Sequence, residues 1–196
     1  MNDMAPAEVE GLFRRCGAVL DGHFLLTSGL HSPVYWEKFR ILEHPDFTER
    51  LCGLIARHFK SSRIDVIAGP TTGGIILAYE VGRQLGLPAI YAEKEGDKRA
   101  FRRGFMLTPG ERVLVVDDVL TTGKSVREVL DAVAERGGVV MGIGVLVDRS
   151  EHDLGLGYSL FSCLRSAAVA YQPEECPLCQ KGLPLVKPGS SKQARS

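Results

Sequence analysis

The residues best suited to chemistry follow one apolar segment. Residues 112–117 predict a buried strand that ends in two adjacent carboxylates, Asp117 and Asp118. The run that follows opens a predicted helix over 125–136 and consists mainly of small or hydroxyl-bearing residues: Val119, Leu120, Thr121, Thr122, Gly123, Lys124 and Ser125. Backbone N–H groups at a helix N-terminus bind anions, so the run predicts a phosphate site. The two carboxylates would repel a second phosphate and suit sugar hydroxyls or a hydrated Mg²⁺.

Other readings of this run are weaker. Gly123-Lys124-Ser125 resembles the end of a P-loop, but that motif requires glycine at position 118, where Asp118 stands. A G-x-G-x-x-G fingerprint is also absent, because Val147 occupies the place of its third glycine. The remaining alternative is that the acids merely cap a helix. Two carboxylates followed by Thr-Thr-Gly make a sugar carrying a phosphate the better interpretation.

The elements around this run alternate between strand and helix. Helices are predicted over 6–20, 46–60, 75–85 and 125–136, and strands over 23–26, 34–36, 64–68, 88–92, 112–117 and 139–147. The alternation after residue 64 predicts a central parallel sheet flanked by helices on both faces, and the two short early strands predict a small flap. Ligands of such sheets lie at the carboxyl ends of the strands. The loops at those ends are 69–74, 93–104 and 117–125.

Two of these loops suit a bulky anion. Residues 69–74 contain the pair Gly73-Gly74, which lets the backbone approach a ligand closely, although an ordinary strand-to-helix turn would look the same. Residues 93–104 are predicted to form a cationic lid between Gly96 and Gly104. Its basic residues are Lys94, Lys98, Arg99, Arg102 and Arg103.

Composition excludes several classes of protein. The 196 residues carry 24 Lys+Arg and 24 Asp+Glu, and this zero net charge argues against a general nucleic-acid binder. No apolar run is long enough to span a membrane. Residues 1–10 lack Lys and Arg, so we expect no secretory signal. Five cysteines do not suggest a disulfide framework, and we expect a cytoplasmic protein.

The thirteen residues 113–125 resemble the phosphoribosyl-diphosphate (PRPP) signature of the type I phosphoribosyltransferases. Residues 22–35 and Val147-Asp148-Arg149 are further similar to the orotate phosphoribosyltransferases. The resemblance covers about residues 8–186. It implies a type I phosphoribosyltransferase fold with an N-terminal hood, mainly 1–40, a core of about 46–165 and a mobile catalytic loop. We expect residues 187–196 to form a disordered tail.

The resemblance also implies an activity: transfer of ribose 5-phosphate from PRPP to orotate, which gives orotidine 5′-phosphate and pyrophosphate in UMP biosynthesis. It implies Mg²⁺ carried by PRPP and a homodimer whose lid reaches the neighbouring site. The implied catalytic residues are Asp117, Asp118, Lys94, Lys98 and Arg99. PRPP would bind residues 117–125 and Lys94, with its pyrophosphate at Thr71, Thr72, Gly73 and Gly74. Orotate would bind Thr121, Arg149, Ser28 and Gly29.

The chain departs from the family pattern at two positions. Gly73 stands where several orotate enzymes have a lysine, so Lys94 or the lid must supply that charge. Glu93-Lys94 replaces the usual Arg-Lys pair before the lid. A purine-base transferase or a PRPP-sensing regulator of the same fold are the alternative functions.

The cysteines and histidines suggest no site. Cys176 and Cys179 form a lone C-x-x-C, for which a turn without metal is the preferred interpretation and a metal or redox role stays open. The five histidines show no ligand spacing and are expected to be structural or surface residues.

Overall fold

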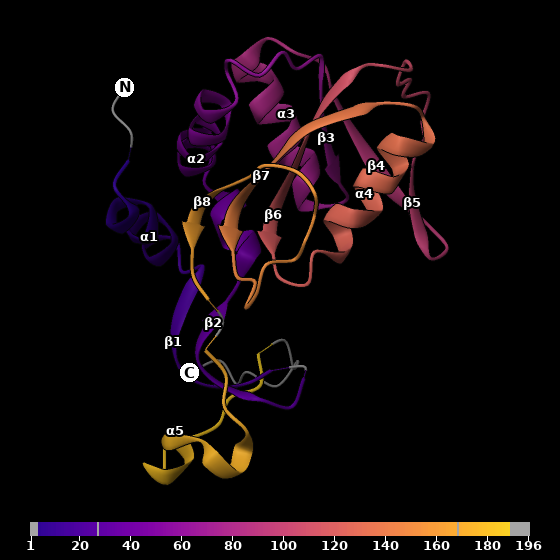
Figure 1. The fold of residues 1–196 in the computed structure, drawn as a ribbon. Coiled ribbons are helices and arrows are strands. Elements are labelled where there is room, and N and C mark those ends of the chain that lie inside the picture. The colour runs from indigo at the N-terminus through magenta and orange to yellow at the C-terminus, as the bar shows by residue number, and fades with distance from the viewer. Residues whose placement is uncertain (1–3, 27, 168, 189–196) are drawn as a thin grey trace.

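A six-stranded sheet forms the centre of the computed structural model, which describes residues 4–26, 28–167 and 169–188 (Figure 1). The strand order is β5-β4-β3-β6-β7-β8, and every pair is parallel except the antiparallel edge pair β4–β5. The strands are β3 (Val66–Pro70), β4 (Ala89–Glu95), β5 (Lys98–Phe101), β6 (Arg112–Leu120), β7 (Val139–Asp148) and β8 (Leu160–Arg165). The predicted parallel sheet is therefore confirmed.

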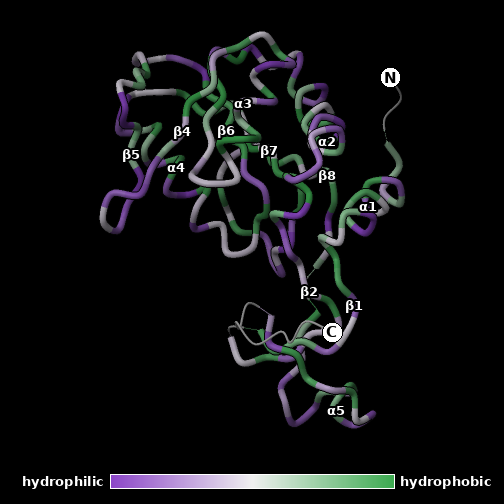
Figure 2. The backbone as a smooth tube through the Cα atoms, turned by 180° about the vertical axis from the view of Figure 1, so that it is seen from behind, coloured by the Kyte–Doolittle hydropathy of each residue, from purple (hydrophilic) through white to green (hydrophobic). Residues whose placement is uncertain are grey.

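Helices cover both faces of this sheet because the central strands are apolar on both sides. On β6, Leu114 and Val116 pack in one core cluster with α2 and α3, whereas Val113 and Val115 pack in a second cluster with α4. Figure 2 shows these inner strands as the most hydrophobic part of the chain. The helices are α1 (Pro6–Arg15), α2 (Pro45–His58), α3 (Gly73–Leu85) and α4 (Lys124–Glu135).

A smaller hood stands beside the sheet at the carboxyl ends of its parallel strands (Figure 1). It contains α1, the antiparallel hairpin of β1 (Val19–Leu25) and β2 (His31–Trp36), and the 3₁₀ helix η1 (Lys38–Glu43). The C-terminal segment carries η2 (Pro173–Glu175) and α5 (Pro177–Gln180) and lies against the far end of this hairpin. No helix of the described ranges has both the length and the apolarity that a membrane span requires.

Three expectations about the elements were wrong. The first helix ends at Arg15, not at residue 20, because Gly17 adopts a φ of +70° and the chain turns into β1. Residues 93–104 are not a loop: β4 and β5 form a hairpin with a tight turn at Gly96, whose φ is +63°. Strand β8 was not predicted, because its pattern is short and half-exposed. The predicted disordered tail lies mostly outside the described residues, at 189–196.

Candidate functional site

The two adjacent acids lie inside a strand and face opposite sides of the sheet. Strand β6 stays paired with β7 as far as Leu120, so it runs past both acids and does not end at residue 117 as predicted. Successive side chains of a strand alternate between its faces. Asp117 therefore points toward α4, as Val113 and Val115 do, and Asp118 points toward the start of α3.

Both carboxylate oxygens of Asp117 have hydrogen-bond partners. The Ser125 hydroxyl donates to one at 2.6 Å, and the backbone N–H of Asp118 donates to the other at 2.8 Å. The residue is 5% exposed. Burial, and next the charge of Asp118, raise the pKa of the Asp117 carboxyl from 3.8 to about 6. Asp117 thus fixes the loop that begins α4, but holding its charge there is costly.

Removal of the Asp117 charge is expected to stabilise the fold. Because the folded pKa of about 6 exceeds the unfolded value of 3.8, the folded state loses stability as pH rises through this window. We expect Asp117→Asn to raise the free energy of unfolding at pH 8 by up to about 3 kcal/mol, and by progressively less toward pH 4. Urea unfolding across this pH range measures the difference. A loss of stability at pH 8 that matches the loss at pH 4 would contradict the assignment.

Asp118 keeps one carboxylate oxygen free in a buried place. Its Oδ1 accepts the backbone N–H of Val119 at 2.6 Å and pairs with Lys38 Nζ at 3.1 Å. Its Oδ2 is buried without a hydrogen-bond partner in the described structure. A Cβ at Gly73 would lie 2.3 Å from this oxygen, so only glycine permits the approach. A buried acceptor without a partner points to a ligand that supplies the donor.

Lys38 is a site residue that the sequence analysis missed. It lies on η1 of the hood, 80 positions before Asp118, and no local pattern links the two. Its ammonium brings a cation next to the glycine pair that begins α3. A lysine from the hood thus lies near Gly73, although the loop 69–74 itself contains no lysine.

The predicted phosphate loop borders a cavity of about 260 Å³. Gly123 precedes the first residue of α4 with a φ of +74°, and the first N–H groups of a helix have no partner within it. Lys94 and Arg99 of the β4–β5 hairpin line the same cavity. The remaining lining residues are Val119, Thr121, Thr122, Gly123, Lys124, Ser125 and Glu128. The cavity therefore combines helix N–H groups with cations from a second element.

The cations of the β4–β5 hairpin differ in their surroundings. Arg99 is 8% exposed; it donates to the Thr71 hydroxyl at 2.8 Å and pairs with Glu128 at 3.1 Å. It thereby ties the hairpin to the loop before α3. Lys98 is directed elsewhere, since its ammonium pairs with the exposed Glu135 at 3.0 Å. Lys94 lines the cavity and forms no ion pair within the described residues.

Arg149 lies just beyond the carboxyl end of β7, and one N–H group of its guanidinium has no hydrogen-bond partner in the described structure. Asp148 accepts the N–H and the hydroxyl of Ser150, which fixes the turn that carries Arg149. The guanidinium lies over the Trp36 ring of the hood, 5.6 Å from its centroid. Its Nε is buried without a hydrogen-bond partner among the described atoms, and burial lowers the pKa of the group. Such an arginine suits a carboxylate ligand.

Ser28 and Gly29 lie in the turn between β1 and β2. The N–H of Gly29 donates to the Leu26 carbonyl at 2.9 Å, and Gly29 has a φ of +84°. Among the described residues, no hydrogen bond or ion pair joins this turn to Arg149 or to the acids. The structure thus brings Lys94, Arg99 and the loop 121–125 to one cavity and joins Asp117 to that loop through Ser125. Asp118 faces Gly73, and the hairpin turn has no hydrogen bond to either group within the described residues.

Comparisons with known proteins show which family the chain resembles over most of its length. The family model described as phosphoribosyl transferase domain matches residues 39–164. The chain is 50% identical over 189 residues to an orotate phosphoribosyltransferase of Pelotomaculum thermopropionicum, covering 96% of this chain and 100% of the relative. It is 46% identical over 192 residues to the corresponding protein of Chlorobaculum parvum, covering 98% of this chain and 100% of the relative.

Solved structures extend this similarity. Orotate phosphoribosyltransferase from Aeropyrum pernix superposes with a TM-score of 0.69 at 29% identity, covering 80% of this chain and 93% of that one. The Mycobacterium tuberculosis H37Rv orotate phosphoribosyltransferase in complex with inorganic phosphate gives a TM-score of 0.66 at 27% identity. The match covers 82% of this chain and 95% of that one. An adenine phosphoribosyltransferase from Thermoanaerobacter pseudethanolicus gives a TM-score of 0.60 at 20% identity, covering 68% of this chain and 88% of that one. At this identity the similarity shows a shared fold alone.

Proposed function

The chain belongs to the orotate phosphoribosyltransferases, and on that premise we propose how its residues transfer ribose 5-phosphate from PRPP to orotate. The observation that carries the proposal is the buried Oδ2 of Asp118, which has no hydrogen-bond partner in the described structure, on the same strand-loop-helix unit as the N-terminus of α4. An acceptor for a hydroxyl and N–H donors for a phosphate lie at the same strand end. This combination matches a phosphorylated sugar.

PRPP is proposed to lie across the carboxyl ends of β3 and β6. Its 5′-phosphate would accept hydrogen bonds from the backbone N–H groups of residues 121–125. Its ribose hydroxyls would donate hydrogen bonds to the acid pair, chiefly to Asp118 Oδ2. Thr71 to Gly74 would face the pyrophosphate, because Gly73 and Gly74 begin α3 with no side chain in the way. Arg99 positions this loop through its hydrogen bond to Thr71.

Magnesium suits this donor set. Asp118 offers an uncommitted carboxylate oxygen, and hard oxygen ligands are those that Mg²⁺ prefers. Mg²⁺ bound by PRPP would neutralise charge on the pyrophosphate. The residues of this chain that could meet such a complex are Asp118 and Asp117, whereas Lys38 limits the negative charge beside them.

Orotate is proposed to bind between Arg149 and Thr121. The Arg149 Nε has no hydrogen-bond partner among the described atoms and would donate to a carboxylate, and the Trp36 ring packs against the guanidinium. Ser28 and Gly29 would contribute if the hairpin turn approaches the base once it is bound. A hydroxyl donor and a fixed guanidinium would then select a pyrimidine that carries a carboxylate.

Transfer would proceed without a covalent enzyme intermediate. The C1–O bond to pyrophosphate breaks, and a ring nitrogen of the deprotonated orotate forms the new bond to C1, giving orotidine 5′-phosphate. The anomeric carbon becomes oxocarbenium-like, so the work of the protein is alignment and stabilisation of charge on the leaving group. Lys94, which lines the cavity at 121–125, is the cation proposed for that second task. The product is the precursor of UMP.

A homodimer is proposed as the working form. Ile76 and Tyr79 on α3 are 43% and 67% exposed, and Phe39 on the neighbouring η1 is 46% exposed. Exposed apolar side chains on neighbouring elements are typical of an interface between subunits. A hairpin that lies at the edge of the sheet could then reach the partner's site.

A base-specificity assay tests the function. Protein, PRPP and Mg²⁺ are mixed with orotate, uracil, adenine, hypoxanthine or guanine, and pyrophosphate release is measured. We expect release with orotate at a rate at least about 100-fold above that with the other bases, because they lack the carboxylate that pairs with Arg149. A preference for a purine base, or PRPP binding without release, would contradict the proposal.

A further inference from the structure

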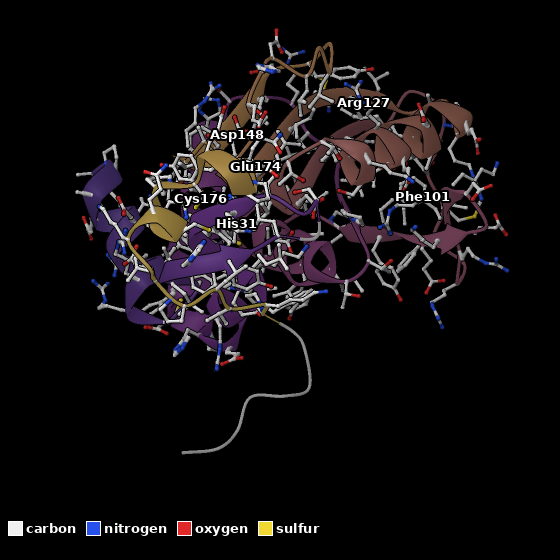
Figure 3. All side chains as sticks on the ribbon, turned by 90° about the horizontal axis from the view of Figure 1, so that it is seen from below. His31, Phe101, Arg127, Asp148, Glu174 and Cys176 are labelled. Carbon is white, nitrogen blue, oxygen red and sulfur yellow. The ribbon has the colours of Figure 1, made fainter. Side chains whose placement is uncertain are left out.

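Two histidines of the hood and two cysteines of the C-terminal segment meet at one point. His23, His31, Cys176 and Cys179 each offer a ligand atom, and the four atoms lie within 4.8 Å of one another. The first three residues are at most 6% exposed. The expectation that the histidines show no ligand spacing holds only along the chain, since the fold joins residues more than 140 positions apart. Figure 3 shows His31 and Cys176 side by side where the hairpin meets this segment.

The protonation of His23 shows which nitrogen faces the cluster. Its Nδ1 lies 2.8 Å from the Leu183 carbonyl oxygen, which only accepts, so Nδ1 carries the proton and donates it. Its Nε2 therefore presents a lone pair toward the cluster. A backbone carbonyl that orients a histidine in this way is a regular feature of metal-binding histidines.

Three polar groups converge on that single lone pair. His31 Nδ1 lies 3.0 Å from His23 Nε2, Cys176 Sγ lies 3.5 Å from it and Cys179 Sγ lies 3.7 Å from it. One lone pair accepts one good hydrogen bond. If the Cys179 thiol donates instead to His31 Nδ1, which lies 3.2 Å away, the lone pairs of the two histidines face each other at 3.0 Å. A cation at the centre would satisfy all four groups at once.

The spacing fits a tetrahedral zinc ion. Zn–S bonds of about 2.3 Å and Zn–N bonds of about 2.0–2.1 Å imply ligand separations of about 3.3 Å for N···N and about 3.5 Å for N···S. The structure has 3.0 Å for N···N and 3.2, 3.5 and 3.7 Å for N···S. Two thiolates and two neutral imidazoles also balance the 2+ charge, which suits a largely buried site.

Local structure presents each ligand toward the centre. The register of the β1–β2 pair shifts between Asp21 and Phe24, and the resulting irregularity buries His23 together with its neighbour Phe24. Cys176 is the N-cap of α5, so Cys179 follows it by about one helical turn, and Gly182 ends the turn with a φ of +67°. Both pairs of ligands are thus held by backbone geometry.

The C-terminal segment has little else to hold it. Cys176 is the only buried residue among the described residues 171–188. Backbone hydrogen bonds fasten this segment at two places: between His31 and Tyr171, and between Val186 and both His23 and Leu25. Small units without an apolar core generally need a metal or a disulfide. We propose that His23, His31, Cys176 and Cys179 bind a structural Zn²⁺ that fastens the C-terminal segment to the hood.

The test is metal binding by the full-length protein. Protein is purified, loaded with Zn²⁺, dialysed against a weak chelator and analysed for zinc by mass spectrometry. We expect about one zinc per chain in the wild type and less than about a tenth of that in Cys179→Ser and His31→Gln, because a structural site needs all four ligands. Cys16→Ser is the matched control: its thiol donates to the Phe13 carbonyl far from the cluster, and zinc should stay unchanged.

A cobalt spectrum separates loss of a ligand from loss of the fold. Co²⁺ loaded into the wild type should give thiolate-to-metal charge-transfer absorption, weaker in Cys179→Ser although its circular dichroism is unchanged. Removal of the metal from the wild type should expose residues 171–188 to limited proteolysis. Absence of zinc and of the cobalt absorption in the wild type, full zinc in Cys179→Ser, or a Cys176–Cys179 disulfide in protein purified under reducing conditions would each overturn the proposal.

Discussion

Replacement of Lys94 by methionine is expected to lower kcat about 100- to 1,000-fold, which corresponds to about 2.7–4 kcal/mol of lost transition-state stabilisation. Lys94 lines both the cavity at 121–125 and the adjoining hollow beside Arg102 and Arg103. Arg103 and Arg102 are paired with Glu93 and Glu95, whereas Lys94 has no ion pair within the described structure. Its charge is therefore available to a departing pyrophosphate.

The experiment compares three lysines of the same chain. Steady-state rates with PRPP and orotate are measured for Lys94→Met, Lys98→Met and Lys60→Met. Lys60 is exposed beyond the end of α2 and serves as the matched control for loss of one charge. We expect a smaller loss for Lys98→Met, because Lys98 is directed to Glu135. A larger loss at Lys98 than at Lys94 would mean that the hairpin changes register or position when substrates bind.

Replacement of Asp118 by asparagine is expected to reduce kcat/KM for PRPP about 10- to 150-fold, the effect of losing one hydrogen bond to a charged group of about 1.5–3 kcal/mol. Asparagine has the same shape, and its oxygen can still accept the Val119 N–H. It loses the negative charge at Oδ2, the atom that has no partner in the described protein. Initial rates at varied PRPP, with orotate saturating, measure the change.

Asp131→Asn is the control for this substitution. Asp131 is exposed on α4, so its replacement changes the net charge equally without touching the site. Thermal unfolding of both variants should show that Asp118→Asn keeps its fold. Activity of Asp118→Asn equal to that of the wild type would place the sugar elsewhere.

Much of the site could be predicted because its parts are local. One strand-loop-helix unit contains the apolar run 113–116, the acid pair and the small residues after it. Its hydrophobic pattern and its turn-forming residues predict this unit from the sequence. The same holds for Gly73 and Gly74 at the start of α3. The prediction of a loop over 93–104 was wrong because alternating charges are typical of a solvated loop. In the structure, ion pairs from Arg102 and Arg103, just beyond β5, to Glu95 and Glu93 of β4 support a hairpin.

The sequence by itself determined the sheet, the helices on both its faces and the position of the acids near the carboxyl end of a buried strand. These follow from interactions between residues a few positions apart. Only the tertiary structure decided that Lys38 reaches Asp118, that Trp36 lies under Arg149, and that two histidines of β1 and β2 meet Cys176 and Cys179. Each of these contacts joins the hood to a distant segment. Their partners depend on how the hood packs against the rest of the chain, and spacing along the chain carries no record of that packing.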